Sequence, residues 1–250
     1  MSQADIALVP KLQLGNPEGE ALASQDGKLE LPAPNSQARA WELAEIQSRD
    51  LVNDEKADIV DGLFGSNLKA SEYITAGTPI ARIQNVKRLI FIDKNIYYVS
   101  DEKAEELKRH SFKGGDILIT KLGDPLGLAC IAPPKIEKGI IVADLVRFRP
   151  DIRVVSNKYL NYLLNSETVI KQIAEHVKGT TRPRINLKVI RDLNLPIAPL
   201  AEQQQIAAKL DGLLAQVDTL KTRLDTIPKI LKRFRQSVLA AAVSGRLAWE

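Results

Sequence analysis

Residues 201–227 read AEQQQIAAKLDGLLAQVDTLKTRLDTI, and this stretch decides the architecture of the chain. Its aliphatic residues recur every three or four positions, which is the spacing of a coiled-coil seam on one helix face. An isolated amphipathic helix is marginal in water, so we expect a partner to cover this face. The seam residues are Ile206, Leu210, Leu213, Val217, Leu220, Leu224 and Ile227.

The helical pattern resumes after Pro228. A proline inside a helix cannot donate its backbone hydrogen bond, so we expect the helix to kink or break there. Beyond it, Leu231, Phe234 and Val238 extend the apolar face. We therefore predict that residues 199–250 form one long helical arm of coiled-coil type, kinked near Pro228, which serves as an interface.

Upstream of the arm, short strand-like segments alternate with turns. We expect strands at 79–83, 89–92, 116–120, 129–132, 139–143, 145–148 and 193–197, with 116–120 and 129–132 pairing as a hairpin. Short helices are expected at 101–109 and between 156 and 178, with Ser100, Ser156 and Ser166 as N-caps. The predicted fold class is α+β, with a mixed-sheet domain over residues 39–198. Residues 1–38 mix Gly, Pro, Ser, Gln and Asn and are expected to be a flexible leader.

The charge of the chain is distributed unevenly. The net charge is +4, but residues 1–53 hold four basic and eight acidic residues, so residues 54–250 carry +8. A basic body favours a polyanionic partner. Cys130 is the single cysteine, which excludes disulfide frameworks and thiolate metal sites. We find no apolar run of the ~18 residues that a membrane span needs. We expect a cytoplasmic protein without a membrane partner.

Sequence signatures of catalysis are missing. We find no Gly-rich phosphate-binding motif for ATP and no methyltransferase motif, and the two histidines, His110 and His176, stand alone. Asp93 and the segment 106–108 (Glu-Leu-Lys) match the spacing of a magnesium-dependent nuclease. That chemistry requires strands, whereas 106–108 falls on a short charged helix. We therefore predict a protein that is not an enzyme, with no catalytic residue, metal or cofactor of its own.

Four segments resemble the DNA specificity (S) subunits of type I restriction–modification systems. Residues 195–206 (LPIAPLAEQQQI) are similar to the Pro-x-x-Glu-Gln element that opens the helical arm of this family, and 234–247 (FRQSVLAAAVSGRL) resemble the end of that arm. Residues 114–123 (GGDILITKLG) and 181–186 (TRPRIN) resemble elements of its target recognition domain. The likeness runs from about Trp41 to residue 250. A full-length member has two recognition domains and two arms, whereas this chain has one of each.

The resemblance implies a function. The recognition domain would bind one half of a bipartite site in double-stranded DNA, and the arm would dock methyltransferase (M) subunits and pair two copies as a homodimer. Through the complex it would recruit the motor–nuclease (R) subunit, with S-adenosylmethionine, ATP and Mg expected on those partners. Residues 201–227 would span ~40 Å as a helix, close to the ~34–36 Å of one DNA turn.

Three groups of basic and amide residues are the candidates for DNA contact, because Lys and Arg suit phosphates or guanine while Gln and Asn suit adenine. The first group is Lys69, Ser71, Arg82, Gln84, Asn85, Lys87 and Arg88, and the second is Lys121 with the turn 123–127. The third group, the strongest because two arginines flank Pro183, is Lys178, Thr180, Thr181, Arg182, Arg184 and Asn186.

Two other functions fit the same sequence. The chain can be a truncated recognition domain with a regulatory or anti-restriction role, which binds M subunits but not DNA. It can also be the reader domain of a single-chain restriction–methylation enzyme. Salt-dependent DNA binding would separate the first alternative from a specificity subunit, because neutralising phosphates gives a steep salt dependence.

Overall fold

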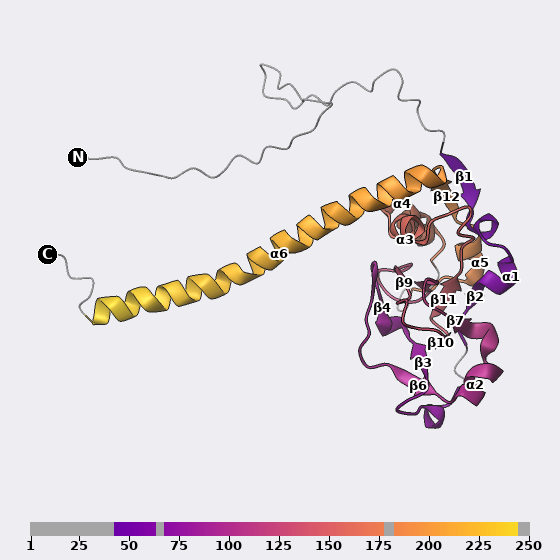
Figure 1. Cartoon of the computed structure of the whole chain (residues 1–250), viewed down its shortest axis with the longest axis horizontal. Coiled ribbons are helices and arrows are strands. Elements are labelled where there is room, and N and C mark those ends of the chain that lie inside the picture. Colours follow the sequence, from indigo (N-terminus) through magenta and orange to yellow (C-terminus); the bar gives the residue numbers. More distant parts are fainter. Residues whose placement is uncertain (1–42, 64–67, 178–182, 245–250) are drawn as a thin grey trace, which may run out of the picture. The chain divides into compact units, whose positions relative to one another are not determined.

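A computed structural model of the chain describes residues 43–63, 68–177 and 183–244. The chain divides into two units, Met1–Glu42 and Leu43–Glu250. The predicted leader, 1–38, lies outside the described residues, and so do Trp41 and the segments 178–182 and 245–250. The description below concerns the second unit, which is drawn in colour in Figure 1.

The described residues contain two four-stranded sheets. The first has the order β2 (Ile59–Asp61), β11 (Leu145–Phe148), β8 (Ile117–Thr120), β9 (Ala129–Ile131), and its pairs are all antiparallel. The second has the order β6 (Tyr97–Val99), β3 (Thr78–Ala81), β10 (Gly139–Ile141), β7 (Ser111–Phe112), and is mixed because β3 and β10 run parallel. The predicted mixed sheet is confirmed, and so is the hairpin, since Ile117 pairs with Ile131.

In each of two further strand pairs, the sequence predicted one strand and not its partner. β1 (Ala44–Gln47) pairs antiparallel with β12 (Asn194–Ile197), the strand that leads into the arm, and β4 (Val86–Lys87) pairs with β5 (Ile90–Phe91). The sequence pattern gave no signal for β1, β2, β6 or β7, because strands of two to four residues are too short to establish a period of two. The β1–β12 pair ties the start of the described domain to the base of the arm.

Short helices surround the sheets: α1 (Glu55–Asp58), α2 (Asp101–Glu106), α3 (Asn157–Leu164), α4 (Glu167–Glu175) and α5 (Leu187–Arg191), with 3-10 turns at Ser48–Leu51, Ala70–Glu72, Ile83–Asn85 and Lys108–His110. The predicted caps of α2 and α4 are confirmed, because Ser100 Oγ and Ser166 Oγ accept the backbone N–H groups of Lys103 and Val169. Ser156 is the N-cap residue of α3, as predicted, although its side chain makes no capping hydrogen bond. The backbone N–H of Ser156 donates to Oε1 of Gln203 on the arm.

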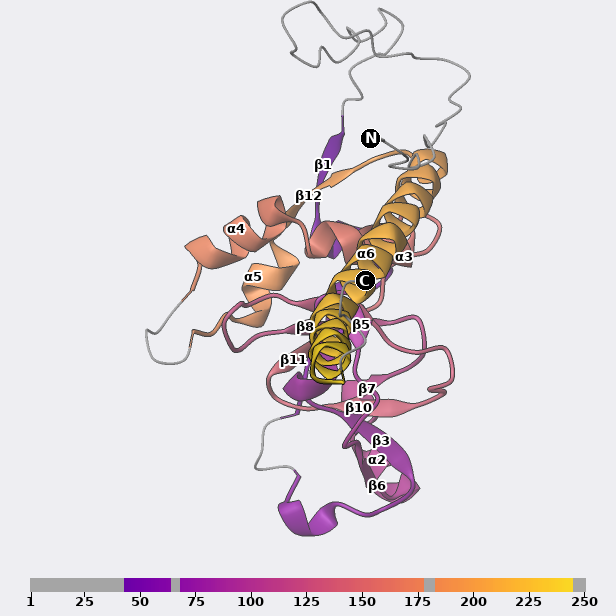
Figure 2. The same cartoon turned by 90° about the vertical axis from the view of Figure 1, so that its left-hand side faces the viewer.

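Strand β8 is buried on both faces. Ile117 and Ile119 pack into a cluster with Phe148 and the helices α3 and α4, through residues such as Leu160 and Ile173. Leu118, on the opposite face, joins a second cluster with Phe112, Cys130 and Ile141. Alternate side chains of a strand point to opposite faces, so burial on both explains an uninterrupted apolar run. Figures 1 and 2 show β3, β6 and α2 at the end of the domain away from the start of α6.

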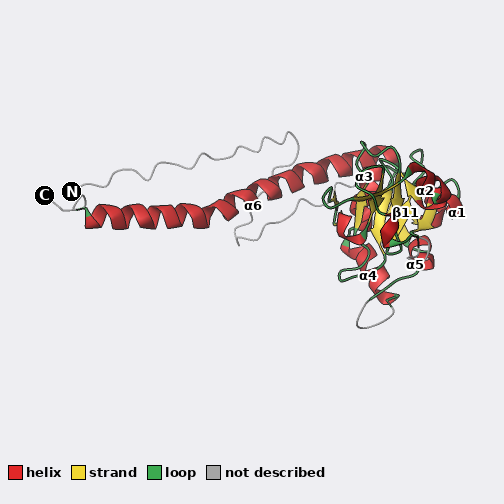
Figure 3. Cartoon of the chain, turned by 90° about the horizontal axis from the view of Figure 1, so that it is seen from below, coloured by secondary structure: helices red, strands yellow, loops and turns green. Residues whose placement is uncertain are grey.

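The arm is one helix, α6 (Leu200–Val243), of 44 residues and therefore about 66 Å at ~1.5 Å per residue. Pro228 lies inside this helix, so the helix does not break there, which was one of the two predicted outcomes. Figure 3 shows that the helix changes direction partway along and then continues. The missing donor costs one backbone bond, and at an exposed site water can solvate the freed carbonyl. The three-four spacing also continues across the proline, from Ile227 to Leu231. Within the described residues, no helix is long and apolar enough to cross a membrane.

Candidate nucleic-acid interface and partner-binding helix

Most of the first candidate group lies at the surface. Lys69, Ser71, Gln84, Lys87 and Arg88 are exposed. They come from the 3-10 turns Ala70–Glu72 and Ile83–Asn85 and from the β4–β5 hairpin, where Leu89 adopts a left-handed φ of 65°. Four of the five carry a long polar side chain that can reach a nucleic acid without disturbing the core.

Arg82 is held in a fixed plane. Its Cζ lies 4.0 Å from the ring centroid of Tyr97, and Nη2 donates to the carbonyl of Asn95 at 3.0 Å. The ring of Tyr97 stacks in turn on Tyr73, with centroids 5.0 Å apart and planes at 15°. Sequence reasoning missed both tyrosines, since the strand that carries Tyr97 was not predicted. Cation–π packing restricts a guanidinium, so the stack holds the side chain of Arg82 in one orientation.

Asn85 does not belong in this group. It is fully buried, its Nδ2 donates to the carbonyls of Ile92 (2.9 Å) and Lys94 (3.2 Å), and its Oδ1 accepts the N–H of Arg82 (3.0 Å). With both donors and the acceptor used inside the protein, the amide has nothing to offer to a base edge. Its role is to shape the 83–95 loop.

Lys121, in the second group, is also buried inside the domain. The residue is only 6% exposed, and Nζ lies 3.3 Å from Asp61 Oδ2. The turn that follows requires its glycines: Gly123 and Gly127 have φ values of 117° and 72°, which side chains disfavour. The burial of Lys121 removes it from the surface that DNA could reach.

The third group lies partly outside the described residues, namely Lys178, Thr180, Thr181 and Arg182. Arg184 is described: its side chain is about half exposed and Nη2 pairs with Asp144 Oδ1 at 2.8 Å. Asn186 caps α5, because its Oδ1 accepts the N–H of Val189 at 3.0 Å. Both keep exposed surface, although each already has a partner inside the domain.

The fold brings the groups together. Leu122 forms an isolated bridge with Arg184, and the N–H of Ile185 donates to the carbonyl of Lys121 at 3.0 Å. One part of the first group, the 3-10 turn Ile83–Asn85, approaches the same place, because Ile83 Cδ1 lies 4.0 Å from the position a Cβ would take at Gly123. Segments about forty to sixty residues apart in sequence thus meet around the 121–127 turn, which no sequence pattern indicates.

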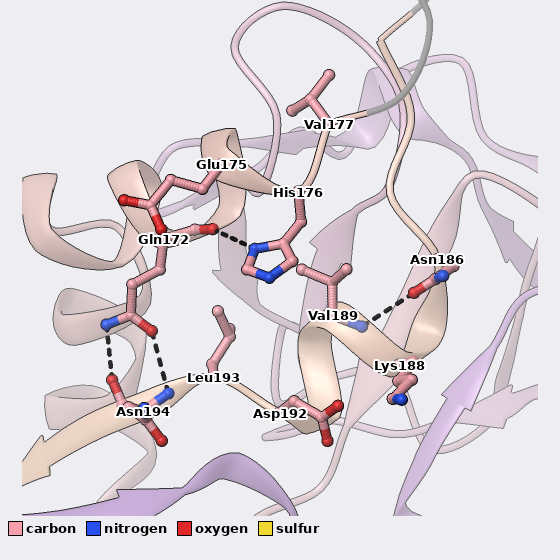
Figure 4. A pocket seen from close by; sticks show the side chains of 10 residues that line it. All are labelled: Gln172, Glu175, His176, Val177, Asn186, Lys188, Val189, Asp192, Leu193 and Asn194. Carbon is pink, nitrogen blue, oxygen red and sulfur yellow. Dashed lines mark hydrogen bonds between the residues drawn. The ribbon is translucent and has the colours of Figure 1, made fainter.

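A hollow of about 700 Å³ lies between α4, α5 and the start of β12 (Figure 4). Gln172 closes one side of the hollow. Its side-chain amide donates to the carbonyl of Asn194 at 2.8 Å and accepts the backbone N–H of Asn194 at 3.0 Å. His176 Nδ1 donates to the carbonyl of Gln172. Glu175 and Asp192 line the hollow together with Lys188. This mixture of charges does not suit a phosphate.

The nuclease-like spacing does not assemble into a site. Asp93 pairs with Lys135, while Glu106 and Lys108 pair with Lys103 and Glu105 respectively. Among the described residues, no group of three or more His, Cys, Asp and Glu could hold a metal ion. Burial raises the pKa of Cys130 to about 12, which keeps it a protonated thiol.

The seam of α6 is uncovered over most of its length. All residues from 212 to 240 are exposed, and Val217, Leu224 and Phe234 expose 56%, 64% and 65% of their surface. Among the predicted interface residues only Leu210 is half-buried. An exposed row of large aliphatic side chains of this length is typical of an interaction surface. The full row is Ile206, Leu210, Leu213, Val217, Leu220, Leu224, Ile227, Leu231, Phe234 and Val238.

Comparison with known proteins gives a consistent result. A family model described as "Type I restriction modification DNA specificity domain" matches residues 58–229. The EcoBI specificity subunit of Escherichia coli is 53% identical over 81 residues, which cover 32% of this chain and 17% of that subunit. The StySPI specificity subunit of Salmonella potsdam is 48% identical over 99 residues, covering 40% and 21%. The matched stretches thus span about a fifth of these relatives.

Solved structures share the fold. The crystal structure of the HsdS subunit from Thermoanaerobacter tengcongensis has a TM-score of 0.57 at 22% identity, covering 84% of this chain and 47% of that one. A chain from a study of type I restriction–modification complex assembly has a TM-score of 0.61 at 21% identity, covering 84% and 48%. Together with the strands and helices described above, they confirm the predicted α+β fold with a long C-terminal helix.

Proposed function

Since the chain belongs to the type I restriction–modification DNA specificity family, we propose that it binds one half of a bipartite DNA site and docks the catalytic subunits through α6. The predicted resemblance is confirmed by a family model that matches well over half of the chain. The relatives are named specificity subunits of type I restriction enzymes. We accordingly propose that the chain is a recognition component and not itself an enzyme.

The exposed seam of α6 is the observation that carries the proposal. A helix that leaves residues 212–240 uncovered has apolar surface for another polypeptide. We assign that surface to M subunits and to a second copy of this chain, with the R subunit recruited through the assembly. S-adenosylmethionine, ATP and Mg would then be bound by those partners.

For DNA contact, the proposal retains the exposed residues of the first group, together with Arg82 on its tyrosine stack. These side chains and the 123–127 turn would form the reading surface. Lys and Arg would contact phosphates or guanine and Gln84 an adenine edge. Lys178, Thr180, Thr181 and Arg182 remain proposed members of this surface.

Charge along α6 favours an antiparallel pair. Residues 200–227 carry four acidic and three basic residues, whereas 228–243 carry four basic and none acidic. Two parallel copies would set the two basic ends side by side, and like charges repel. An antiparallel pair sets each basic end beside the acidic half of the other copy, where Asp218 and Asp225 are exposed. It would also place two recognition domains at opposite ends of the arm and so give a symmetric bipartite target.

The test is a selection on random DNA by mobility shift, with M subunits present, repeated over a salt series. The proposal predicts an enriched sequence with two half-sites and an affinity that falls steeply as salt rises. Binding to M subunits without any DNA binding would support the regulatory alternative instead. A chain that binds neither M subunits nor DNA would overturn the proposal.

A further inference from the structure

The base of α6 is fastened to the recognition domain by one buried glutamine. Gln203 is fully buried, and its Oε1 accepts the N–H of Ser156 at 2.7 Å. Its Nε2 donates to the carbonyls of Val154 (3.1 Å) and Ala198 (2.8 Å). One side chain therefore connects α6 to the end of the loop before α3 and to the end of β12.

A second attachment lies two turns further along the helix. Asp211 accepts a hydrogen bond from the hydroxyl of Tyr162 and pairs with Lys158, and both partners lie on α3. Ala207, between the two attachments, is 3% exposed. Gln203, Ala207 and Asp211 are spaced i, i+4 and i+8, so they form one face of α6 against α3. Figures 1 and 2 show α3 beside this first part of the arm.

The attachment leaves the seam free. At 100° per residue, Asp211 lies about 100° around the helix from Leu210 and about 200° from Leu213. The face that contacts α3 and the face that awaits a partner have therefore diverged by the third turn. The domain can therefore hold the arm rigidly while the seam of the arm pairs with another polypeptide.

A fixed direction matters because the arm is a lever. A tilt of about 5° at the base of this ~66 Å helix moves its far end by about 6 Å, which exceeds the ~3.4 Å rise of one base pair. We infer that Gln203 and Asp211 are positioning residues which fix the direction of α6 relative to the recognition domain, and so set the number of unread base pairs between two half-sites. This inference rests on the proposed function of α6 as a spacer.

The protonation states agree with this arrangement. Burial, and the hydrogen bond to Asp211, raise the pKa of Tyr162 to about 12, so its hydroxyl remains a donor. The bond from Lys158, followed by that from Tyr162, lowers the pKa of Asp211, so its carboxylate remains an acceptor. Both hydrogen bonds of the second attachment are therefore intact near neutral pH.

Distances between spin labels test the direction of the arm without DNA. Labels on cysteines at Lys171→Cys of α4 and Thr226→Cys of α6, diluted with unlabelled chain, report the angle within one protomer, while the native Cys130 is fully buried. The unaltered chain should give one narrow distance distribution. Gln203→Met, and separately Asp211→Ala with Tyr162→Phe, should broaden it. Gln204→Ala, at the exposed position next to Gln203, is the matched control and should not.

Selection on bipartite DNA with varied gaps tests the consequence. The unaltered chain and Gln204→Ala should choose one gap length. The variants should accept neighbouring lengths and lose about tenfold or more of the discrimination, as expected when two or three hydrogen bonds are lost, while half-site affinity stays unchanged. If Gln203→Met does not fold, the Asp211 and Tyr162 variant decides alone. Unchanged distances or an unchanged gap in that variant would overturn the inference, whereas absence of DNA binding by the unaltered chain would overturn the proposed function only.

Discussion

Two regions of the same helix reverse the usual pattern of burial. At the base of α6 a polar residue, Gln203, is fully buried, whereas further along large aliphatic residues such as Val217 and Leu224 are more than half exposed. Buried polar groups are stable where every donor and acceptor is paired, as here. Exposed apolar rows are stable when another polypeptide covers them. The base of the helix is therefore complete within the chain, and the remainder is completed by a partner.

Charge introduced into the exposed region should have the largest effect. We expect Leu220→Asp with Leu224→Asp to weaken self-association and M-subunit binding by at least about a hundredfold, because each buried leucine in an interface is worth several kcal/mol. Light scattering and titration with M subunits measure this. Thr219→Asp, also exposed on α6, is the control. Normal association of the double variant would show that the seam is not the interface.

Removal of the buried glutamine should have the next largest effect, this time on the stability of the chain itself. Gln203→Ala leaves the N–H of Ser156 and two carbonyls unsatisfied, so we expect a loss of about 2–4 kcal/mol in the free energy of unfolding. Urea denaturation measures the change. Gln204→Ala, at the exposed neighbouring position, should be close to neutral. Equal losses of stability at the two positions would contradict the conclusion that buried Gln203 fastens α6 to the domain while its exposed neighbour does not.

A third comparison separates surface from structural residues in the recognition domain. Lys87→Ala and Arg88→Ala should each weaken DNA binding across all sequences and reduce the salt slope by about 1, because phosphate contacts release counterions. Asn85→Ala should instead destabilise the domain, since Asn85 bonds three backbone groups. Mobility shifts over a salt series and thermal unfolding separate these outcomes. If the salt slope were unchanged in both the Lys87 and the Arg88 variant, the β4–β5 hairpin would not be part of the DNA interface.

The smallest expected effect is that of acid on the second attachment. The pKa of Asp211 is lowered below its ordinary value of 3.8, so its stabilising contribution is present above that value and is lost as pH falls through the lower folded value. The pair is largely exposed, so the change will be small. Spin-label distances measured from neutral to acid pH should broaden in the unaltered chain more than in Asp211→Ala. Equal broadening would mean that Asp211 carries no part of the attachment.

The sequence predicted the features that depend on local periodicity. The seam of α6, the β8–β9 hairpin and the caps at Ser100 and Ser166 all follow from residue spacing or from one residue type beside a helix. The strands β1, β6 and β7 could not be predicted, because each is completed by a distant partner. The β1–β12 pair, for example, joins residues about 150 positions apart.

The candidate site was predicted less well for the same reason. Lys121 and Asn85 look like surface residues in sequence, yet Asp61 and the carbonyls of Ile92 and Lys94 engage them within the fold. Arg82 was predicted, but the tyrosine stack that fixes its plane requires β6 to lie beside β3. Gln203 belongs to the Pro-x-x-Glu-Gln element of the sequence, but its three hydrogen bonds are evident only from the structure.

Hydrogen exchange along α6, with and without M subunits, tests the central claim most directly. The account predicts that amides of residues 212–240 exchange rapidly in the chain alone, at a concentration too low for it to pair, and slow strongly when M subunits are added. The amides around Gln203 should be protected in both states. Exchange that is equally fast over 212–240 in both states would contradict the claim that this helix joins the recognition domain to its catalytic partners.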